Sequence, residues 1–200
     1  MMLLYTDVGF ETFIFDMDGT LVELNLPFDE IRKTLDIRGR FILESIMHLD
    51  EDERQKKFEI LKQFEIEAAK RTRLMPHAKD ILDKIDSLGL KKGIVTRNCR
   101  ESVEIIAERF GLDFDFIITR EDAEPKPSPA PVLMALKMAN SRPEKSITIG
   151  DFKFDLMAGK AAGTKTALLL TERNRIMAKD FLHLADYVLR SLIELEKFLY

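Results

Sequence analysis

The sequence predicts an α/β fold in which a doubly wound, Rossmann-like parallel sheet carries a small all-helical insert after its first strand. The apolar run at residues 13–15 is continuous, as in strands buried on both faces of a parallel sheet. From Pro76 onward, such runs alternate with helical patterns of about 10 to 15 residues, which is typical of βαβ units. Residues 22–75 are rich in helix formers and have no strand pattern.

Composition narrows the class of protein. The 200 residues suffice for one domain with a small insert, and the 46% apolar fraction is normal for a globular core. With 31 basic and 35 acidic residues, a net charge of −4 and no strongly basic segment, we expect no nucleic-acid partner. The single cysteine, Cys99, excludes an internal disulfide framework. Residues 1–10 do not resemble a secretory signal, and no apolar run approaches the ~18 residues of a membrane span. We therefore expect a cytoplasmic protein with no membrane partner.

The insert is predicted to contain two or three helices. Apolar residues recur in it at helical spacing, with charged residues between them. Asp50, followed three residues later by Glu53, is a candidate N-cap for a long helix that runs to about Arg71. We expect a core domain made of residues 1–21 and 76–200, and a helical cap domain made of residues 22–75.

The remaining chain is predicted to alternate strands with helices. The expected later strands are residues 92–96, 114–118, 146–150, 166–170 and, more briefly, 187–189. The expected helices are one stopped by Gly89, one capped by Asn98 with Glu101 and ended by Gly111, one capped by Ser128 that runs to about Ala139, one over 154–162, and a last one capped by Ser191 with Glu194.

Polar side chains follow four of the expected strands. They are Asp16 and Asp18 after the first, Thr96, Arg97 and Asn98 after the second, Lys126 after the third, and Asp151 and Asp155 after the fourth. Ligands bind at the carboxyl edge of such sheets, so we expect these side chains to meet there. Carboxylates suit Mg²⁺, whereas a hydroxyl, an ammonium and free helix amides suit phosphate oxygens. The pattern therefore predicts a metal-assisted phosphoryl-transfer site.

Four motifs in this order and spacing resemble those of the haloacid dehalogenase-like (HAD) hydrolase superfamily. They are Asp16-Met17-Asp18-Gly19-Thr20, Thr96, Lys126, and Gly150-Asp151 with Asp155 four residues further on, and the resemblance extends from Phe13 to Leu170. Within the superfamily the chain is similar to phosphoglycolate phosphatase-like members, whose helical cap follows the first motif. The resemblance implies a Mg²⁺-dependent phosphatase whose partner is a small phosphate ester.

The resemblance also implies roles for the motif residues. Asp16 would be the nucleophile that forms an aspartyl-phosphate, and Asp18 the general acid and then base. Mg²⁺ would be held by Asp16, Asp151 and the backbone carbonyl of Asp18. Asp155 is expected to orient Lys126 or a metal-bound water rather than to bind the metal. Thr96 and Lys126 would hold the phosphoryl oxygens, with help from Gly19, Arg97 and Asn98.

Each of these residues also has a structural alternative. Asp16 and Asp18 could form a strand-end turn, Lys126 a solvated loop charge, and Asp151 an N-cap. Thr96 could be an ordinary strand residue, Asp155 a surface helix residue, Asn98 only a helix cap, and Cys99 a packed small residue rather than a reactive thiol. Three functional alternatives stay open, namely a phosphomutase, a protein phosphatase of the same superfamily, and a catalytically silent regulatory module.

Overall fold

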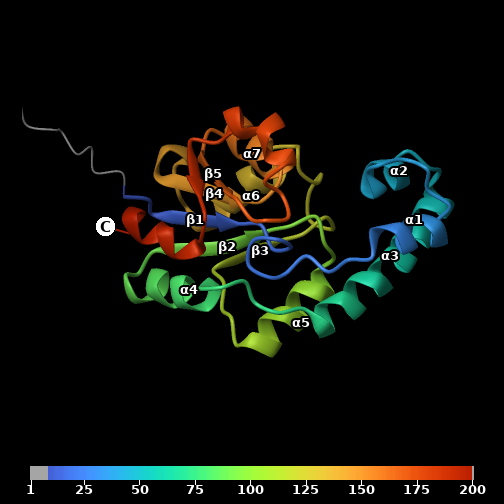
Figure 1. The fold of residues 1–200 in the computed structure, drawn as a ribbon, viewed down its shortest axis with the longest axis horizontal. Helices are drawn as coiled ribbons and strands as arrows, with labels where there is room; N and C mark the ends of the chain where they lie inside the picture. The colour runs from blue at the N-terminus through green and yellow to red at the C-terminus, as the bar shows by residue number, and fades with distance from the viewer. Residues whose placement is uncertain (1–8, 200) are drawn as a thin grey trace, which may run out of the picture.

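A six-stranded parallel sheet forms the centre of the computed structural model, which describes residues 9–199 (Figure 1). Residues 1–8 and 200 of the expected core domain lie outside the described residues. The strand order is β3-β2-β1-β4-β5-β6. The strands are β1 (Thr12–Phe15), β2 (Lys91–Val95), β3 (Phe116–Ile118), β4 (Ser146–Gly150), β5 (Lys165–Leu169) and β6 (Tyr187–Leu189). The predicted doubly wound α/β fold is therefore confirmed.

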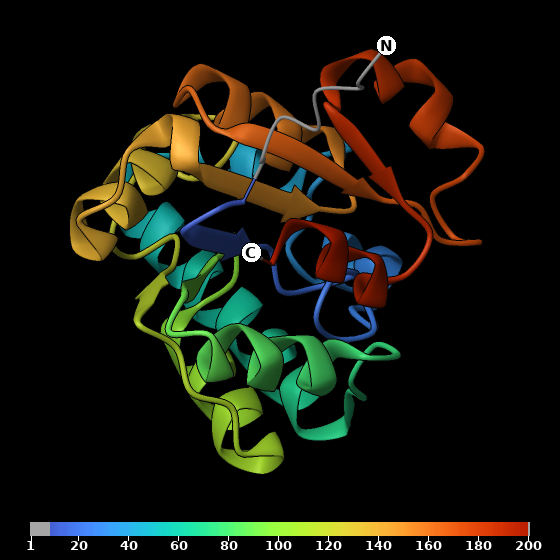
Figure 2. The same cartoon turned by 90° about the vertical axis from the view of Figure 1, so that its left-hand side faces the viewer.

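Helices cover both faces of the sheet (Figure 2). One face packs on α4 (Ala78–Ser87), α5 (Arg100–Phe110) and the 3₁₀ helix η4 (Leu192–Phe198), and the other on α6 (Ala130–Ala139) and α7 (Lys153–Ala161). Phe13 and Phe15 enter the first layer, whereas Ile14 enters the second. Successive side chains of a strand point to opposite faces, so a strand covered by helices on both sides needs apolar residues in succession, as at Phe13, Ile14 and Phe15. Short 3₁₀ helices η1 (Pro143–Lys145), η2 (Met177–Asp180) and η3 (Leu182–Leu184) occupy the connections.

The register of the central strands places their carboxyl ends side by side. Phe15 of β1 pairs with Ile94 of β2 and with Ile149 of β4. The strand order reverses between β1 and β4, which is the topological switch point where open α/β sheets bind ligands. Asp16 directly follows β1 and Asp151 directly follows β4, so the two carboxylates meet across this point.

The insert is helical, as predicted. Its helices α1 (Phe28–Thr34), α2 (Ile42–Met47) and α3 (Glu51–Arg71) lie to the side of the sheet in Figure 1 and share a separate apolar cluster. Asp50 Oδ1 accepts a hydrogen bond from the backbone N–H of Glu53 at 3.0 Å, which confirms Asp50 as the N-cap of α3. Within residues 9–199, no helix is both long and apolar enough to cross a bilayer.

Two antiparallel linkers join the insert to the sheet. Val22 and Leu74 form an isolated bridge, and the backbone N–H of Met75 donates to the Leu21 carbonyl at 2.9 Å. The chain thus leaves and re-enters the core at adjacent points. The point of exit comes only a few residues after the end of β1 in the sequence. The division into a cap of residues 22–75 and a surrounding core stays a prediction.

Three predicted helix caps differ from the structure. Asn98 does not cap α5, because the N-cap position is Cys99 and the Asn98 side chain turns toward Asp18. Helix α6 begins one residue later than expected, after Pro129, although the Ser128 hydroxyl still accepts a bond from the Ala130 N–H at 3.3 Å. The last helix is the 3₁₀ helix η4, and the hydroxyl of Ser191 makes no cap hydrogen bond. At Asn98 the tertiary hydrogen bond to Asp18 outweighs the local capping pattern.

Candidate active site

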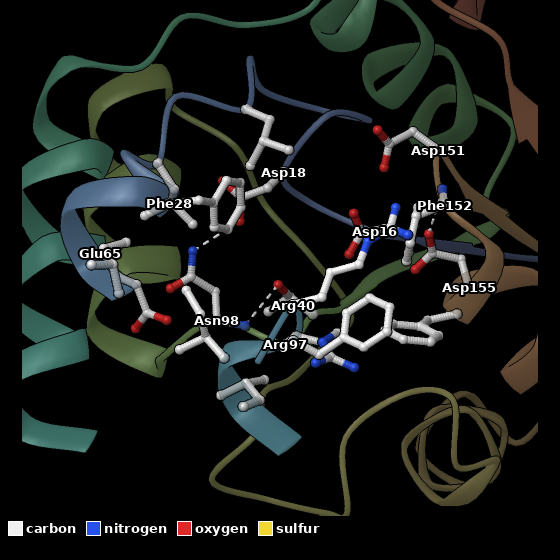
Figure 3. A pocket seen from close by; sticks show the side chains of 18 of the residues that line it. Asp16, Asp18, Phe28, Arg40, Glu65, Arg97, Asn98, Asp151, Phe152 and Asp155 are labelled. Atoms are coloured by element: carbon white, nitrogen blue, oxygen red, sulfur yellow. Dashed lines mark hydrogen bonds between the residues drawn. The ribbon is translucent and has the colours of Figure 1, made fainter. Parts of the chain in front are cut away.

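A cavity of about 470 Å³ opens between the carboxyl edge of the sheet and the insert (Figure 3). Seven of the nine predicted site residues line it, namely Asp16, Asp18, Thr96, Arg97, Asn98, Asp151 and Asp155. The insert contributes a largely apolar wall made of Leu24, Leu26, Phe28, Ile31, Phe41, Ile42, Leu43 and Leu61. The cavity therefore has a polar floor from the sheet and an apolar side from the insert.

Lys126 is buried beneath the floor of the cavity, with a residue exposure of 2%. Its Nζ donates three hydrogen bonds of 2.6 Å each, to Asp16 Oδ1, Asp155 Oδ1 and the Val95 carbonyl. Burial disfavours the ammonium, but the two carboxylates outweigh burial and raise the pKa of Lys126. The residue is therefore a charged, buried partner of Asp16 and not a solvated loop charge.

Three carboxylates converge beside Lys126. Oxygens of Asp16, Asp151 and Asp155 all lie within 4.8 Å of one another. Burial raises the pKa of Asp16 to about 7, with Asp155 and Asp18 adding to the rise and Lys126 opposing it. Burial, followed by repulsion from Asp16 and Asp155, raises the pKa of Asp151 well above its ordinary value. One ammonium does not balance this much negative charge in a buried site.

The members of the cluster differ in their hydrogen bonding. Both oxygens of Asp155 are used, since Oδ1 accepts from Lys126 and Oδ2 accepts from the Phe152 N–H at 3.0 Å. By contrast, no donor among residues 9–199 bonds to the Asp151 carboxylate, and this residue is 8% exposed. An open buried carboxylate beside a second one is a donor set that fits a hard divalent cation such as Mg²⁺.

Gly19 brings the first motif close to Asp151. Its φ is +89°, and a Cβ at this position would lie 2.4 Å from Asp151 Oδ2, so a side chain here would strain the backbone and displace the Asp151 carboxylate. The backbone of Asp151 is held from the other side, where the buried Asn174 amide donates to its carbonyl at 2.8 Å. Helix α7 has Phe152 at its N-cap position, so Asp151 is not the cap of that helix.

The loop after β2 contacts Asp18. Asn98 Nδ2 donates to Asp18 Oδ2 at 2.8 Å, and the Asn98 backbone N–H donates to Thr96 Oγ1 at 3.1 Å. Burial raises the pKa of Asp18, and the hydrogen bond from Asn98 opposes this rise. Asp18 is thus held at the cavity by a neutral donor, whereas Asp16 is held by a cation.

The Arg97 side chain reaches the insert. Its Nη2 donates to both oxygens of Glu44 in α2, at 2.8 and 2.9 Å, and Nη1 donates to the Lys126 carbonyl. The guanidinium lies 4.6 Å from the centre of the Phe154 ring. The side chain therefore links the core to the insert, and a role for Arg97 in binding phosphate stays a prediction.

Sequence reasoning missed three residues near the site. Glu65 of α3 is 4% exposed, lines the cavity and pairs with the buried Arg120. A signal existed, because Glu65 lies at helical spacing between Leu61 and Ala68 on the apolar face of α3. No comparable pattern marks Arg173, which lines the cavity from the loop after β5.

Cys99 lies beside Glu65 and is buried. Burial raises the pKa of its thiol to about 11, and the neighbouring charge of Glu65 adds to the rise. A thiolate is the reactive form of cysteine, so this environment makes Cys99 a packed residue rather than a reactive thiol.

Comparison with known proteins identifies the family. Residues 23–169 match the haloacid dehalogenase-like hydrolase family. The pyrophosphatase PpaX of Bacillus pumilus is 31% identical, over 92% of this chain and 94% of its own length. A phosphoglycolate phosphatase of Aquifex aeolicus is also 31% identical, over 78% of this chain and 83% of its own. The chain therefore belongs to the haloacid dehalogenase-like hydrolase family, as its motifs predict. Within that family it is an enzyme of the phosphatase type.

Solved structures agree on the fold. A hydrolase from Pseudomonas syringae matches with a TM-score of 0.79 at 24% identity, covering 92% of this chain and 95% of its own. A variant of CbbY from Rhodobacter sphaeroides, solved in complex with xylulose-(1,5)bisphosphate, matches with a TM-score of 0.76 at 21% identity and covers 96% of this chain and all of its own. At these identities the likeness establishes the fold alone.

Proposed function

We propose that the protein is a Mg²⁺-dependent phosphatase that hydrolyses a small phosphomonoester through an aspartyl-phosphate on Asp16. The observation that carries the proposal is the buried cluster in which Lys126 bonds Asp16 while the Asp151 carboxylate stays open. A metal-dependent phosphatase that works through an aspartyl-phosphate needs a nucleophile, a charge that offsets the phosphoryl oxygens, and a site for a cation. All three meet at the floor of one cavity.

The residues present fit Mg²⁺. Asp16 and Asp151 would hold the ion with carboxylate oxygens, and Asp18 would hold it with its backbone carbonyl. When bound, the ion supplies charge neutralisation and orientation of the phosphoryl group. Asp155 already gives both oxygens to Lys126 and Phe152, which supports an orienting role rather than a ligand role.

The proposed chemistry has two balanced steps. A carboxylate oxygen of Asp16 attacks phosphorus, the ester P–O bond breaks, and its electron pair stays on the leaving oxygen, which takes a proton from Asp18. Water then attacks the phosphoryl group and gives a proton to Asp18, while the bond to Asp16 breaks and restores the carboxylate. In this proposal Thr96 at the cavity and the ammonium of Lys126, which is bonded to Asp16, would offset charge on the phosphoryl oxygens.

The dimensions of the cavity favour a small substrate. Its volume of about 470 Å³ lies in the lower half of the ~300–1,000 Å³ range of small-molecule sites. Two relatives carry names that refer to small phosphate compounds, pyrophosphate for PpaX and phosphoglycolate for the Aquifex enzyme. A substrate panel should therefore include both compounds beside sugar phosphates and nucleotides.

Replacing the nucleophile tests the mechanism. We expect Asp16→Asn to lower Mg²⁺-dependent phosphate release from p-nitrophenyl phosphate by at least about a thousandfold, because an amide cannot form the acyl phosphate. Circular dichroism should show an unchanged fold. Asp113→Asn, at an exposed position outside the cavity, is the matched control and should keep full activity.

Other results would overturn the proposal. Undiminished turnover by Asp16→Asn would exclude the aspartyl-phosphate mechanism. Isomerised sugar phosphate in place of free phosphate would identify a phosphomutase. A panel without any turnover, together with a co-purifying protein, would identify a regulatory module.

A further inference from the structure

A buried network links the insert to Asp18 through the loop after β2. Glu65 of α3 and Arg120, which follows β3, are both nearly inaccessible to solvent, with side-chain exposures of 4% and 6%. Buried ion pairs are expensive, and the chemistry proposed above does not use this one. The two residues surround the backbone of residues 97–99, the segment that carries Asn98.

Three hydrogen bonds hold this segment, and a fourth joins Glu65 to Arg120. Glu65 Oε2 accepts from the Cys99 N–H at 3.3 Å, while Glu65 Oε1 bonds to Arg120. Arg120 donates twice, from Nη1 to the Arg97 carbonyl and from its backbone N–H to the Asn98 carbonyl, each at 3.4 Å. The ion pair therefore clamps the loop between a helix of the insert and the end of β3.

The hydrogen bonds also define the orientation of the Asn98 amide. Asn98 Oδ1 accepts from the Cys99 N–H at 2.9 Å, and a backbone N–H can only donate, so the carbonyl oxygen must face Cys99. The amide nitrogen then faces Asp18 and donates to Oδ2 at 2.8 Å (Figure 3). No donor in the described part of the chain bonds to Asp18 Oδ1, and Asp18 lines the cavity.

We infer that Asn98 is a positioning residue for Asp18 and that the Glu65–Arg120 pair holds Asn98 in place. Because Oδ2 accepts the N–H of Asn98, Oδ1 is the oxygen of Asp18 that is left free to carry the proton toward the cavity. When the ester P–O bond breaks, this proton moves from Oδ1 to the leaving oxygen, which has kept the bonding electron pair. The insert thus takes part in orienting the acid as well as in shaping the cavity.

The inference rests on the proposed phosphatase function and differs from a role of Asn98 in binding phosphate. Loss of a phosphate ligand slows all esters alike, because every substrate carries the same phosphoryl group. Loss of acid positioning slows esters in proportion to their need for a proton. p-Nitrophenolate leaves readily without one, whereas the alkoxide of β-glycerophosphate does not.

The test compares kcat/KM for these two esters in the same enzyme preparation. This parameter covers the steps up to transfer of the phosphoryl group to Asp16, so slow hydrolysis of the intermediate does not mask the effect. The ratio of the two values is independent of the fraction of folded enzyme. A variant that folds poorly therefore still gives an interpretable result.

We expect Asn98→Asp and Asn98→Leu each to lower the ratio of β-glycerophosphate to p-nitrophenyl phosphate by about tenfold or more, since general acids contribute ~10²–10⁴-fold. Both variants remove the N–H donor to Asp18, and only Asn98→Asp adds a charge. A decrease of the ratio in both variants is therefore due to loss of the donor. Glu65→Gln should lower the ratio by about threefold, because an uncharged amide holds Arg120 more weakly. Glu67→Gln, at an exposed position on the same helix, should leave it unchanged.

Two results would overturn the inference. Equal losses for both esters in the Asn98 variants would assign Asn98 to phosphate binding instead. An unchanged ratio in Glu65→Gln would remove the insert from the network. If the unsubstituted protein hydrolyses neither ester, the proposed function itself fails and the inference fails with it.

Discussion

The two walls of the cavity are built in opposite ways. On the sheet side, charged groups meet across long stretches of chain and stay buried, as where Lys126 bonds Asp16, 110 positions away. On the insert side the wall is mostly apolar, and two of the insert's acidic residues, Glu44 and Glu65, bond to core arginines. The difference fits a division in which the core holds the groups proposed to react, whereas the insert shapes the cavity and bonds to the loops around it.

The largest effect on stability is expected where a core charge is removed. Lys126→Met should lower the free energy of unfolding by about 3–5 kcal/mol, because it leaves Asp16 and Asp155 buried without their cation. Urea denaturation followed by circular dichroism measures this loss. Lys137→Met, at an exposed position on α6, is the control and should change stability little. Equal losses of unfolding free energy in both variants would show that the ion pairs of Lys126 do not stabilise the fold.

A second prediction concerns pH and Mg²⁺. Burial raises the pKa of Asp16 to about 7 from 3.8, so between these values the folded protein keeps a proton that the unfolded chain has lost. Stability without metal should therefore fall as pH rises through this window. The proposed Mg²⁺ would bind the carboxylates in their ionised form, so it should raise the Tm more at about pH 8 than at about pH 5.

Differential scanning calorimetry with and without Mg²⁺ checks this prediction. Asp151→Asn serves as the control, because it removes the open carboxylate and should abolish most of the stabilisation by Mg²⁺. A metal-free Tm that rises with pH across the window would contradict the prediction. So would a Mg²⁺ effect of the same size at both pH values.

The smallest effect is expected at the partly exposed bridge between insert and core. Glu44→Gln breaks the ion pair with Arg97. The Glu44 side chain is 36% exposed and that of Arg97 is 23% exposed, so the loss of unfolding free energy should be less than about 1 kcal/mol. Asp29→Asn, which breaks the exposed pair with Arg32 inside α1, is the control. A loss of several kcal/mol in Glu44→Gln would show that charge, rather than apolar packing, secures the insert.

The sequence alone determined the layout of this protein. Strand and helix periodicities are local, so the α/β class, the helical insert and the six strands were all predictable, with ends shifted by one or two residues at several elements. Parallel strands bring their carboxyl ends to one edge, so the sequence was sufficient to predict that Asp16, Asp18, Thr96 and Asp151 meet there. The motif spacing was likewise sufficient to predict the family.

Only the tertiary structure decided how these groups differ from one another. It showed which carboxylate is open, as in Asp151, and which is fully bonded, as in Asp155. It also showed that Asn98, expected to be a helix cap, bonds to Asp18 instead, and that Glu65 is buried in an ion pair with Arg120. Such contacts join residues tens of positions apart, and no local periodicity encodes them. Hydrogen bonding and burial set the charge of each group, so the division of labour within the site depends on the folded chain.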